Sequence, residues 1–395
     1  MDTRPLVHIP PRQRGESGGK HHERIAVSRM TASRFLLIAA LLLASVPVPA
    51  STAGERLEAA VAAIGELERS HNLVVAVDGE RVATRNFRGP GLREPANTKS
   101  LAKTFIAALV GAAIEQGAVA GVDQPVVELI GDRVPAGAPE GIERVTVGHL
   151  LSMQAGLERT SGANYGAWVS SDDWVADALA RPFVDEPGGR MLYSTGNSHI
   201  LSGALTAATG RSTLALAREW LGEPLNITIP AWQTDPQGVY FGGNNMSLSP
   251  LALLQLGELY RLDGVIEGRR VLPADWVEQS WTPRGQSRYH DGYYGYGWFI
   301  TDLAGEAVYF GWGYGGQFLY VVPDLALTVV LTSDPTPPAA RSAHLRRVHR
   351  ILDEQLLPAV RAHRDAAAGA SPSVACNQSA ACPLVAESIS AHSAR

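Results

Sequence analysis

The chain has 395 residues, of which 45% are hydrophobic and 18% are charged, and its formal net charge is −5. This is the composition of a globular protein long enough for one large domain or two smaller ones. No block of like charge stands out, so the sequence indicates neither a nucleic-acid partner nor an anionic membrane surface.

Residues 30–53 have the pattern of a secretory signal peptide. A basic start precedes an apolar run at 35–44, and small residues follow as far as Ala53. The apolar run is too short to span a bilayer, which needs about 20 residues. We therefore expect residues 1–53 to be a non-structural extension that carries a signal peptide. The exported protein, periplasmic or secreted, would then have no membrane span.

The first elements expected after this extension are a helix, a hairpin and a second helix. Apolar residues at helical spacing predict a helix over 56–70. Two strand-like runs within 72–87 flank Asp78 and Gly79, a dipeptide typical of a tight hairpin turn. The next helix is expected over 100–116.

The middle of the chain is predicted to be helical, and strands return after it. The expected helices lie at 145–153, 171–179, 199–209, 213–221, 250–262 and 273–280. The expected strands lie at 293–300, 307–312, 317–322 and 325–332, and an amphipathic helix follows at 340–362. From 366 onward the composition is of low complexity, which is typical of a disordered tail.

These elements predict an α+β fold in which an antiparallel sheet is flanked by helices and interrupted by a helical region. We expect one domain over 54–365. Its α/β part covers about 54–118 and 285–365, and its helical part covers about 119–284. The tail at 366–395 contains the only cysteines, Cys376 and Cys382, which can close a small disulfide loop in an oxidising compartment.

Lysine is nearly absent from this arginine-rich chain. Of the 34 basic residues only three are lysines, namely Lys20, Lys99 and Lys103. The two that follow the expected signal peptide lie on either side of Ser100. A buried lysine can release its proton whereas arginine cannot, so their retention indicates a need for lysine chemistry.

Lys103 stands at the head of a helix that is apolar on every face, from 105 to 114. Such a helix is buried, and Ser100, three residues earlier, lies beside Lys103 on it. The helix N-terminus and the apolar surroundings both disfavour the ammonium form and lower the lysine pKa. Lys103 is therefore predicted to accept the proton of a nucleophilic Ser100.

The sequence Ser100-Leu-Ala-Lys103, after a hairpin and at the head of a buried helix, resembles the serine β-lactamase and penicillin-binding-protein superfamily. The resemblance covers about 57–360 and implies the β-lactamase/transpeptidase-like fold. A second box would be Tyr193-Ser-Thr195, about 90 residues later, as in the class C and esterase branch. In that branch the tyrosine works with the lysine in proton transfer. Thr195 stands where the family pattern has asparagine.

The third box of the resemblance falls at Gly311-Trp312-Gly313, where this chain has no basic residue. The resemblance implies that this strand edge supplies a backbone N–H, which forms an oxyanion hole together with the N–H of Ser100. We assign that role to Tyr314, with Gly315 as the alternative register. The surrounding segment is most similar to 6-aminohexanoate-dimer hydrolases and related family VIII carboxylesterases.

Several weaker candidates for substrate contact follow from the same resemblance. They are Tyr165, Trp168, Asn245 with its neighbour Asn244, Trp312 and Gly313. We expect Trp298, His199 and Trp232 to be core residues instead. No cysteine and histidine set has zinc spacing, so no metal and no cofactor is expected.

These features predict an exported serine hydrolase, either a carboxylesterase or a linear-amide hydrolase, that forms an acyl-enzyme at Ser100. The resemblance places the third-box cation of β-lactamases and D,D-peptidases beside the substrate carboxylate, so its absence favours neutral acyl groups over β-lactams. The alternatives are a β-lactamase, D,D-carboxypeptidase or D-aminopeptidase, and a non-catalytic wall-recognition or sensor protein. A Ser-His-Asp hydrolase is disfavoured, because the one Gly-x-Ser-x-Gly match lies at 15–19, ahead of the signal peptide. The sequence indicates neither the natural substrate nor the oligomeric state.

Overall fold

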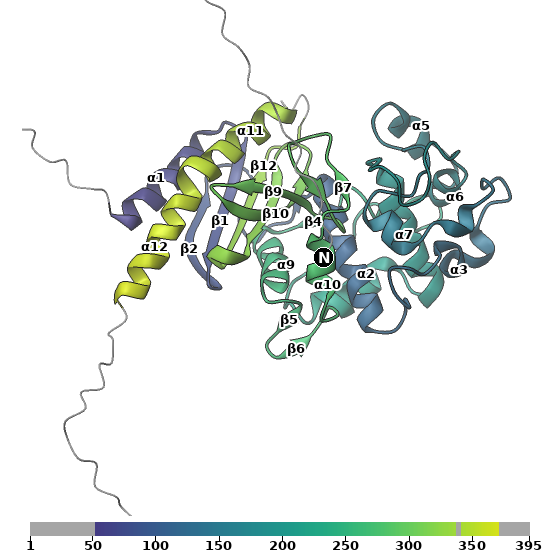
Figure 1. The fold of residues 1–395 in the computed structure, drawn as a ribbon, viewed down its shortest axis with the longest axis horizontal. Coiled ribbons are helices and arrows are strands. Elements are labelled where there is room, and N and C mark those ends of the chain that lie inside the picture. The colour runs from purple at the N-terminus through teal and green to yellow at the C-terminus, as the bar shows by residue number, and fades with distance from the viewer. Residues whose placement is uncertain (1–51, 337–340, 371–395) are drawn as a thin grey trace, which may run out of the picture. The chain divides into compact units, whose positions relative to one another are not determined.

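A computed structural model describes residues 52–336 and 341–370, and an eight-stranded sheet lies at its centre (Figure 1). The strand order is β2-β1-β12-β11-β10-β9-β8-β7, and all neighbours are antiparallel. The strands are β1 Ser70–Val77, β2 Glu80–Asn86, β7 Gly285–Gln286, β8 Tyr293–Tyr294, β9 Phe299–Leu303, β10 Glu306–Gly313, β11 Gln317–Val322 and β12 Leu327–Ser333. The predicted antiparallel sheet is thus confirmed, and the pairing of β1 with β12 joins the two ends of the described chain.

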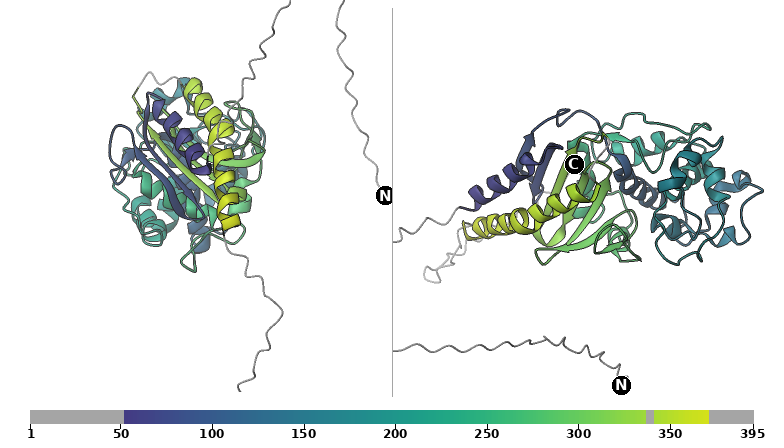
Figure 2. Two further views of the ribbon diagram at one scale, coloured as in Figure 1. Left: turned by 90° about the vertical axis from the view of Figure 1, so that its left-hand side faces the viewer. Right: turned by 90° about the horizontal axis from the view of Figure 1, so that it is seen from above.

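One face of the sheet is covered by the first and last helices. These are α1 (Ala53–Glu66), α11 (Arg341–Ile351) and α12 (Leu357–Ala370), with a π-helical turn at Leu352–Leu356. Figure 2 shows α1 and α12 side by side against the strands. The capping box of Thr52 and Glu55 begins α1. Helix α12 continues to Ala370, past the residue 366 at which the tail was expected to begin, because alanines favour helix.

The other face of the sheet packs against α2 (Ala102–Glu115) and α9 (Pro250–Arg261). Every residue of α2 from Ala102 to Ala113 is buried, as its uniformly apolar sequence predicts. The close approach of α9 to the sheet depends on Gly257, where a Cβ atom would lie 2.5 Å from the methyl group of Thr328. Alternate residues of each central strand face the two cores, so the period of two in the sequence sets both packing surfaces.

The region between β2 and β7 is mainly helical (Figure 1). Besides α2 and α9 it contains α3 Val126–Ile130, α4 Val147–Leu151, α5 Tyr165–Val169, α6 Trp174–Leu179, α7 Thr195–Thr209, α8 Thr213–Ala217 and α10 Trp276–Trp281. It also holds two small strand pairs, β3 (Ala96–Asn97) with β4 (Ser247–Leu248) and β5 (Val265–Ile266) with β6 (Arg269–Arg270).

Two element boundaries differ from the sequence-based expectation for local reasons. Helix α7 begins at Thr195, four residues before the predicted start, because the first backbone N–H groups of the helix donate to the hydroxyls of Ser161 and Thr160 in a neighbouring loop. The strand expected at 293–300 is divided into β8 and β9. The chain reverses between them, where the N–H of Gly295 donates to the carbonyl of Trp298 at 2.9 Å and Gly297 has φ of 78°, so the two strands pair with each other.

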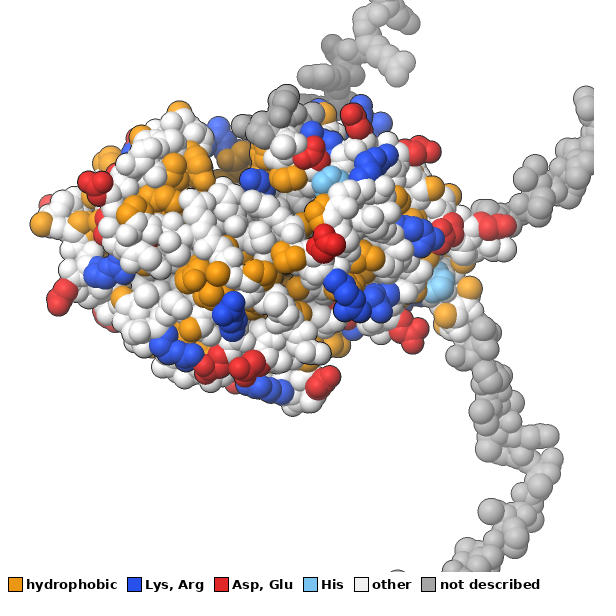
Figure 3. Space-filling view, turned by 180° about the vertical axis from the view of Figure 1, so that it is seen from behind, with side chains coloured by type: hydrophobic (Ala, Val, Ile, Leu, Met, Phe, Trp, Pro, Cys, Tyr) orange, Lys and Arg blue, Asp and Glu red, His pale blue; other side chains and the backbone are white. Residues whose placement is uncertain are grey.

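On the face of the molecule shown in Figure 3, basic and acidic side chains are interspersed among apolar ones. None of the helices in the described residues is long and apolar enough to cross a membrane. The predicted signal peptide and the two cysteines, Cys376 and Cys382, lie outside the described residues.

Candidate active site

Ser100 lies in a single 3-10 turn, Lys99–Leu101, that leads directly into α2. Lys99 has φ of 52°, in the left-handed region that residues other than glycine seldom adopt. Its N–H donates to the side-chain oxygen of Asn97 at 2.9 Å, which holds this turn. The turn leaves Ser100 partly exposed at the head of a buried helix, as a nucleophile must be.

Lys103 is 3% exposed, and its Nζ lies 3.2 Å from Ser100 Oγ. Nζ also donates to the carbonyl of Gly243 at 2.6 Å and lies 3.4 Å from Thr195 Oγ1. Burial lowers the lysine pKa to about 7, because the ammonium form loses its hydration. A neutral amine that donates to Gly243 keeps its lone pair free, so Lys103 can accept the Ser100 proton at neutral pH.

The ring of Tyr193 lies under the amine, with Lys103 Nζ 4.9 Å from the ring centroid. Burial raises the pKa of the Tyr193 hydroxyl, and a hydrogen bond with Ser100 opposes this shift only in part. The phenol therefore stays protonated at neutral pH. It can pass a proton between Ser100, Lys103 and a leaving group, but it is not a base by itself.

Thr195 links the site to a neighbouring loop. Its Oγ1 lies 3.0 Å from Ser161 Oγ, and its N–H donates to the same hydroxyl at 2.9 Å. Ser161 and Gly243 were not predicted from the sequence as parts of the site. The Gly242-Gly243 pair was the available signal for the latter, since paired glycines often mark a close backbone approach.

The strand beside the nucleophile, β10, approaches α2 through its glycines. A Cβ atom at Gly311 would lie 2.6 Å from Thr104 Oγ1, and one at Gly313 would collide with the carbonyl oxygen of Thr98. The predicted third box is therefore a close contact between β10 and the Ser100 turn. Tyr314 and Gly315 follow this contact and both line the cavity, which keeps open the prediction that one of them completes an oxyanion hole with Ser100.

Ser100 opens into a cavity of about 560 Å³. The sheet and the segments beside it supply an aromatic lining, made of Tyr193, Tyr289, Phe299, Trp312 and Phe318. The Ser100 turn and the helical region supply a polar lining, made of Lys99, Arg159, Ser161, Tyr165 and Asn244. The predicted Tyr165 is thus on the cavity, and its hydroxyl accepts a hydrogen bond from Asn244 Nδ2 at 3.0 Å.

A known protein family matches most of this chain. The sequence profile of the family described as Beta-lactamase matches residues 59–353. The chain belongs to the beta-lactamase family. The predicted β-lactamase/transpeptidase-like fold is thereby confirmed, and the protein is a serine hydrolase of that family. A search of curated proteins found no match.

Solved structures share the fold of this beta-lactamase family member at low sequence identity. A Bacillus anthracis protein assigned as a 6-aminohexanoate-dimer hydrolase is 19% identical, with a TM-score of 0.59 and coverage of 76% of this chain and 80% of that one. EstCE1, a hydrolase with promiscuous acyltransferase activity, is 18% identical, with a TM-score of 0.63 and coverage of 76% and 99%. A penicillin-binding-protein homologue from Caulobacter crescentus is 17% identical, with a TM-score of 0.61 and coverage of 79% and 99%.

Three of the predicted substrate contacts do not lie on the cavity of this hydrolase. Trp168 is 0% exposed, and its indole N–H donates to the carbonyl of Trp174 at 2.9 Å, so it is a core residue. Asn245 does not line the cavity, because its Nδ2 donates to Gln233 and its Oδ1 lies near Lys99 Nζ, whereas its neighbour Asn244 lines the cavity. Gly313 is buried against the Ser100 turn and does not line the cavity, whereas the predicted Trp312 does.

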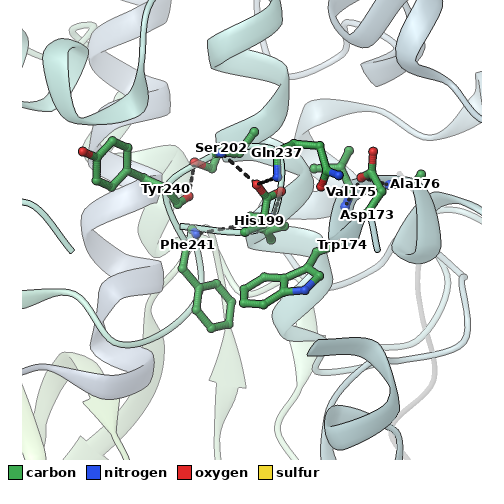
Figure 4. Close-up of polar contacts among 12 residues, drawn as sticks. Asp173, Trp174, Val175, Ala176, His199, Ser202, Gln237, Tyr240 and Phe241 are labelled. Atoms are coloured by element: carbon green, nitrogen blue, oxygen red, sulfur yellow. Dashed lines mark hydrogen bonds and ion pairs between the residues drawn. The ribbon is translucent and has the colours of Figure 1, made fainter. Parts of the chain in front are cut away.

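His199 is buried as predicted. It bonds the residue next to Gly243, whose carbonyl accepts the hydrogen bond of Lys103. Its Nε2 bonds Asp235 Oδ2 at 3.0 Å, and its Nδ1 accepts the N–H of Gly242 at 3.3 Å. Figure 4 shows the ring together with Trp174 and Phe241, whose ring centroids lie 5.5 and 5.6 Å away. Burial lowers the His199 pKa, which favours the neutral ring that this pattern requires.

The other two residues that were predicted to lie in the core, Trp232 and Trp298, are 8% and 0% exposed. Within residues 52–336 and 341–370, no group of three His, Cys, Asp or Glu side chains is placed to hold a metal ion.

Proposed function

We propose that this beta-lactamase family member is an exported carboxylesterase or linear-amide hydrolase with Ser100 as its nucleophile. The observation that carries the proposal is the cavity beside Ser100, where β10 presents Trp312 between two glycines and no cation. An aromatic lining of this kind suits apolar acyl groups. The fold shared with EstCE1, described as a hydrolase with acyltransferase activity, supports chemistry at an acyl group.

The contacts of Ser100 support a two-step acyl transfer. Its Oγ forms a bond to the substrate carbonyl carbon while its proton moves to Lys103 Nζ, 3.2 Å away. The tetrahedral intermediate collapses, the bond to the leaving oxygen or nitrogen breaks, and that atom takes the proton back through Lys103 and Tyr193. Water then cleaves the Ser100 ester, which releases the acid and restores the serine.

Two substrates test the preference for linear acyl compounds. We expect a higher kcat/KM for p-nitrophenyl butyrate than for a chromogenic cephalosporin. A charge-assisted contact to a carboxylate contributes about 1.5–3 kcal/mol, and β10, the strand of the third box, has no cation to make one. The cations of the cavity lie on its polar lining, away from the β-lactam carboxylate position that the third box would supply. If the cephalosporin has the higher kcat/KM, the protein is a β-lactamase and the esterase proposal is wrong.

Covalent labelling tests the nucleophile. A fluorophosphonate should label the wild-type protein, and Ser100→Ala should abolish both labelling and turnover. Ser161→Ala is the matched control, because Ser161 also lines the cavity but its hydroxyl bonds Thr195 rather than Lys103. Labelling that persists in Ser100→Ala would rule out the assignment. Labelling without turnover of any ester or amide would indicate a sensor.

The proposal of export rests on the sequence pattern at residues 30–53. Expression of the full chain with a C-terminal tag should yield a shortened protein in the periplasm or medium. N-terminal sequencing of that protein should begin between about 50 and 54. Recovery of the uncleaved chain from the cytoplasm alone would contradict export.

A further inference from the structure

The cavity beside Ser100 carries positive charge. Among the residues that the structure describes, its lining includes the cations Lys99 and Arg159, and no aspartate or glutamate. The chain as a whole has a net charge of −5, so this local excess is not a general property of the protein. A cavity with one sign of charge and apolar walls attracts ligands of the opposite sign.

Arg159 has no partner among the described residues, although an acid stands next to it in the chain. Glu158 is engaged by Arg181 at 3.0 Å, and Arg181 also binds Asp177 at 2.7 Å. Arg159 lines the cavity, is partly buried, and has an unpaired guanidinium within the described chain. The other cation, Lys99, has only the amide oxygen of Asn245 near its Nζ, at 3.4 Å.

The loop that carries Arg159 is fixed close to the reacting groups. Asn164 Nδ2 donates to the Arg159 carbonyl at 3.0 Å, which holds the backbone at this position. Two residues further on, Ser161 bonds Thr195, and Thr195 Oγ1 lies 3.4 Å from Lys103 Nζ. A substrate group that binds Arg159 is therefore held by a loop that is hydrogen-bonded to Thr195, next to Lys103.

We propose that Arg159, with Lys99 as a second cation, binds a carboxylate of the substrate. The preferred substrates are then linear esters or amides that place an apolar group on the aromatic lining and a free carboxylate on the polar lining. A guanidinium suits this role, because it is always charged and its two parallel N–H groups match a carboxylate. This inference rests on the proposed hydrolase function, and it identifies the substrate class of the same site.

Two pairs of esters, each with and without one charge, test the inference. The first pair is mono-4-nitrophenyl glutarate and its methyl ester, which place the carboxylate on the acyl side. The second is 3-butyryloxybenzoate and its methyl ester, which place it on the leaving group. For at least one pair, the wild-type enzyme should favour the carboxylate by about tenfold or more in kcat/KM, the scale of one charge-assisted contact.

Arg159→Gln should reduce that ratio by about tenfold, and Arg159→Lys should reduce it less, because lysine keeps the charge without the paired N–H groups. Arg269→Gln is the matched control, since Arg269 is exposed on β6 and does not line the cavity; it should leave the ratio unchanged. A wild-type enzyme without preference in either pair, or equal loss for both members in Arg159→Gln, would overturn the inference.

A binding measurement separates this inference from the proposed function. Calorimetry of the full chain should detect benzoate and not benzamide, and Arg159→Gln should weaken benzoate binding by about tenfold. Benzoate binding that depends on Arg159 would support the carboxylate site even if no ester is hydrolysed. Equal binding of benzoate to the wild-type protein and to Arg159→Gln would reject it even if esters are hydrolysed.

Discussion

The proton acceptor in this site is a lysine held neutral by burial. Because the pKa of Lys103 is lowered to about 7, the amine gains its lone pair as pH rises through that value. We expect kcat/KM to rise with pH on an acid limb centred near 7. Lys103→Arg should be nearly inactive, because arginine keeps its proton. A profile that stays flat from pH 5 to 9 would contradict this role.

The same burial costs stability. Between the folded pKa of about 7 and the ordinary lysine pKa of 10.5, the unfolded state binds more protons than the folded one, so stability rises with pH over that window. The cost is present in full below about pH 7 and vanishes above about 10.5. Lys103→Met should therefore raise Tm at pH 7, by about 2 °C or more, and the gain should shrink toward pH 10. Calorimetric scans at both pH values measure this, and an equal change at both would refute it.

Tyr193 is expected to contribute to proton transfer and not to substrate affinity. Tyr193→Phe keeps the ring beneath Lys103 and removes the hydroxyl that bonds Ser100. The rate of acylation should fall roughly 10²-fold, the scale of general acid–base catalysis, with little change in substrate binding. Single-turnover kinetics separates the two quantities. Wild-type acylation in this variant would show that Tyr193 serves only in packing.

At the scale of elements, α7 positions the acceptor of Lys103 through His199. The Gly242 N–H is held by His199 Nδ1, and the next carbonyl, of Gly243, accepts from Lys103. The Gly243 carbonyl stabilises the charged form of Lys103 more than the neutral form, so displacing this carbonyl should lower the lysine pKa further. His199→Phe should therefore move the acid limb to lower pH. It should also reduce kcat about tenfold or more, because Lys103 loses the acceptor that positions it.

His199→Asn provides the matched control for that prediction. The asparagine side-chain oxygen can replace the ring nitrogen as acceptor for Gly242, so this variant should restore part of kcat and return the limb toward 7. Loss of thermal stability without any movement of the limb would mean that the buried His199 and Asp235 pair is structural only.

At the scale of the whole molecule, the two ends of the described chain build one face of the sheet. The C-terminal segment buries Leu352, Leu356, Leu357 and Val360, each at most 1% exposed. Full burial of one such side chain contributes about 1.5–3 kcal/mol, so four together are comparable with the whole stability of a typical domain. A chain ending at Ile351 should therefore not fold cooperatively, as measured by denaturant unfolding. A chain ending at Ala370 is the control and should unfold like the full chain, and equal cooperativity in both would contradict the argument.

Features that depend on neighbours along the chain follow directly from the amino-acid sequence. Period-two alternation determined the sheet faces, and the apolar helix after Ser100 determined the burial of Lys103. The spacing of Ser100 and Lys103 determined their contact, because residues three apart on a helix are adjacent. These are local rules, so the fold class and the nucleophile with its base could be predicted before the structure.

The contacts of this pair with distant segments depend on tertiary packing. Gly243, 140 residues after Lys103, supplies its acceptor, and Arg159 lines the same cavity. Trp168 was expected at the cavity and lies in the core, where its ring packs against Trp174 and its indole N–H donates to the carbonyl of that residue. Which side of a loop faces a cavity depends on packing between elements, and a single sequence contains no period or spacing that encodes it.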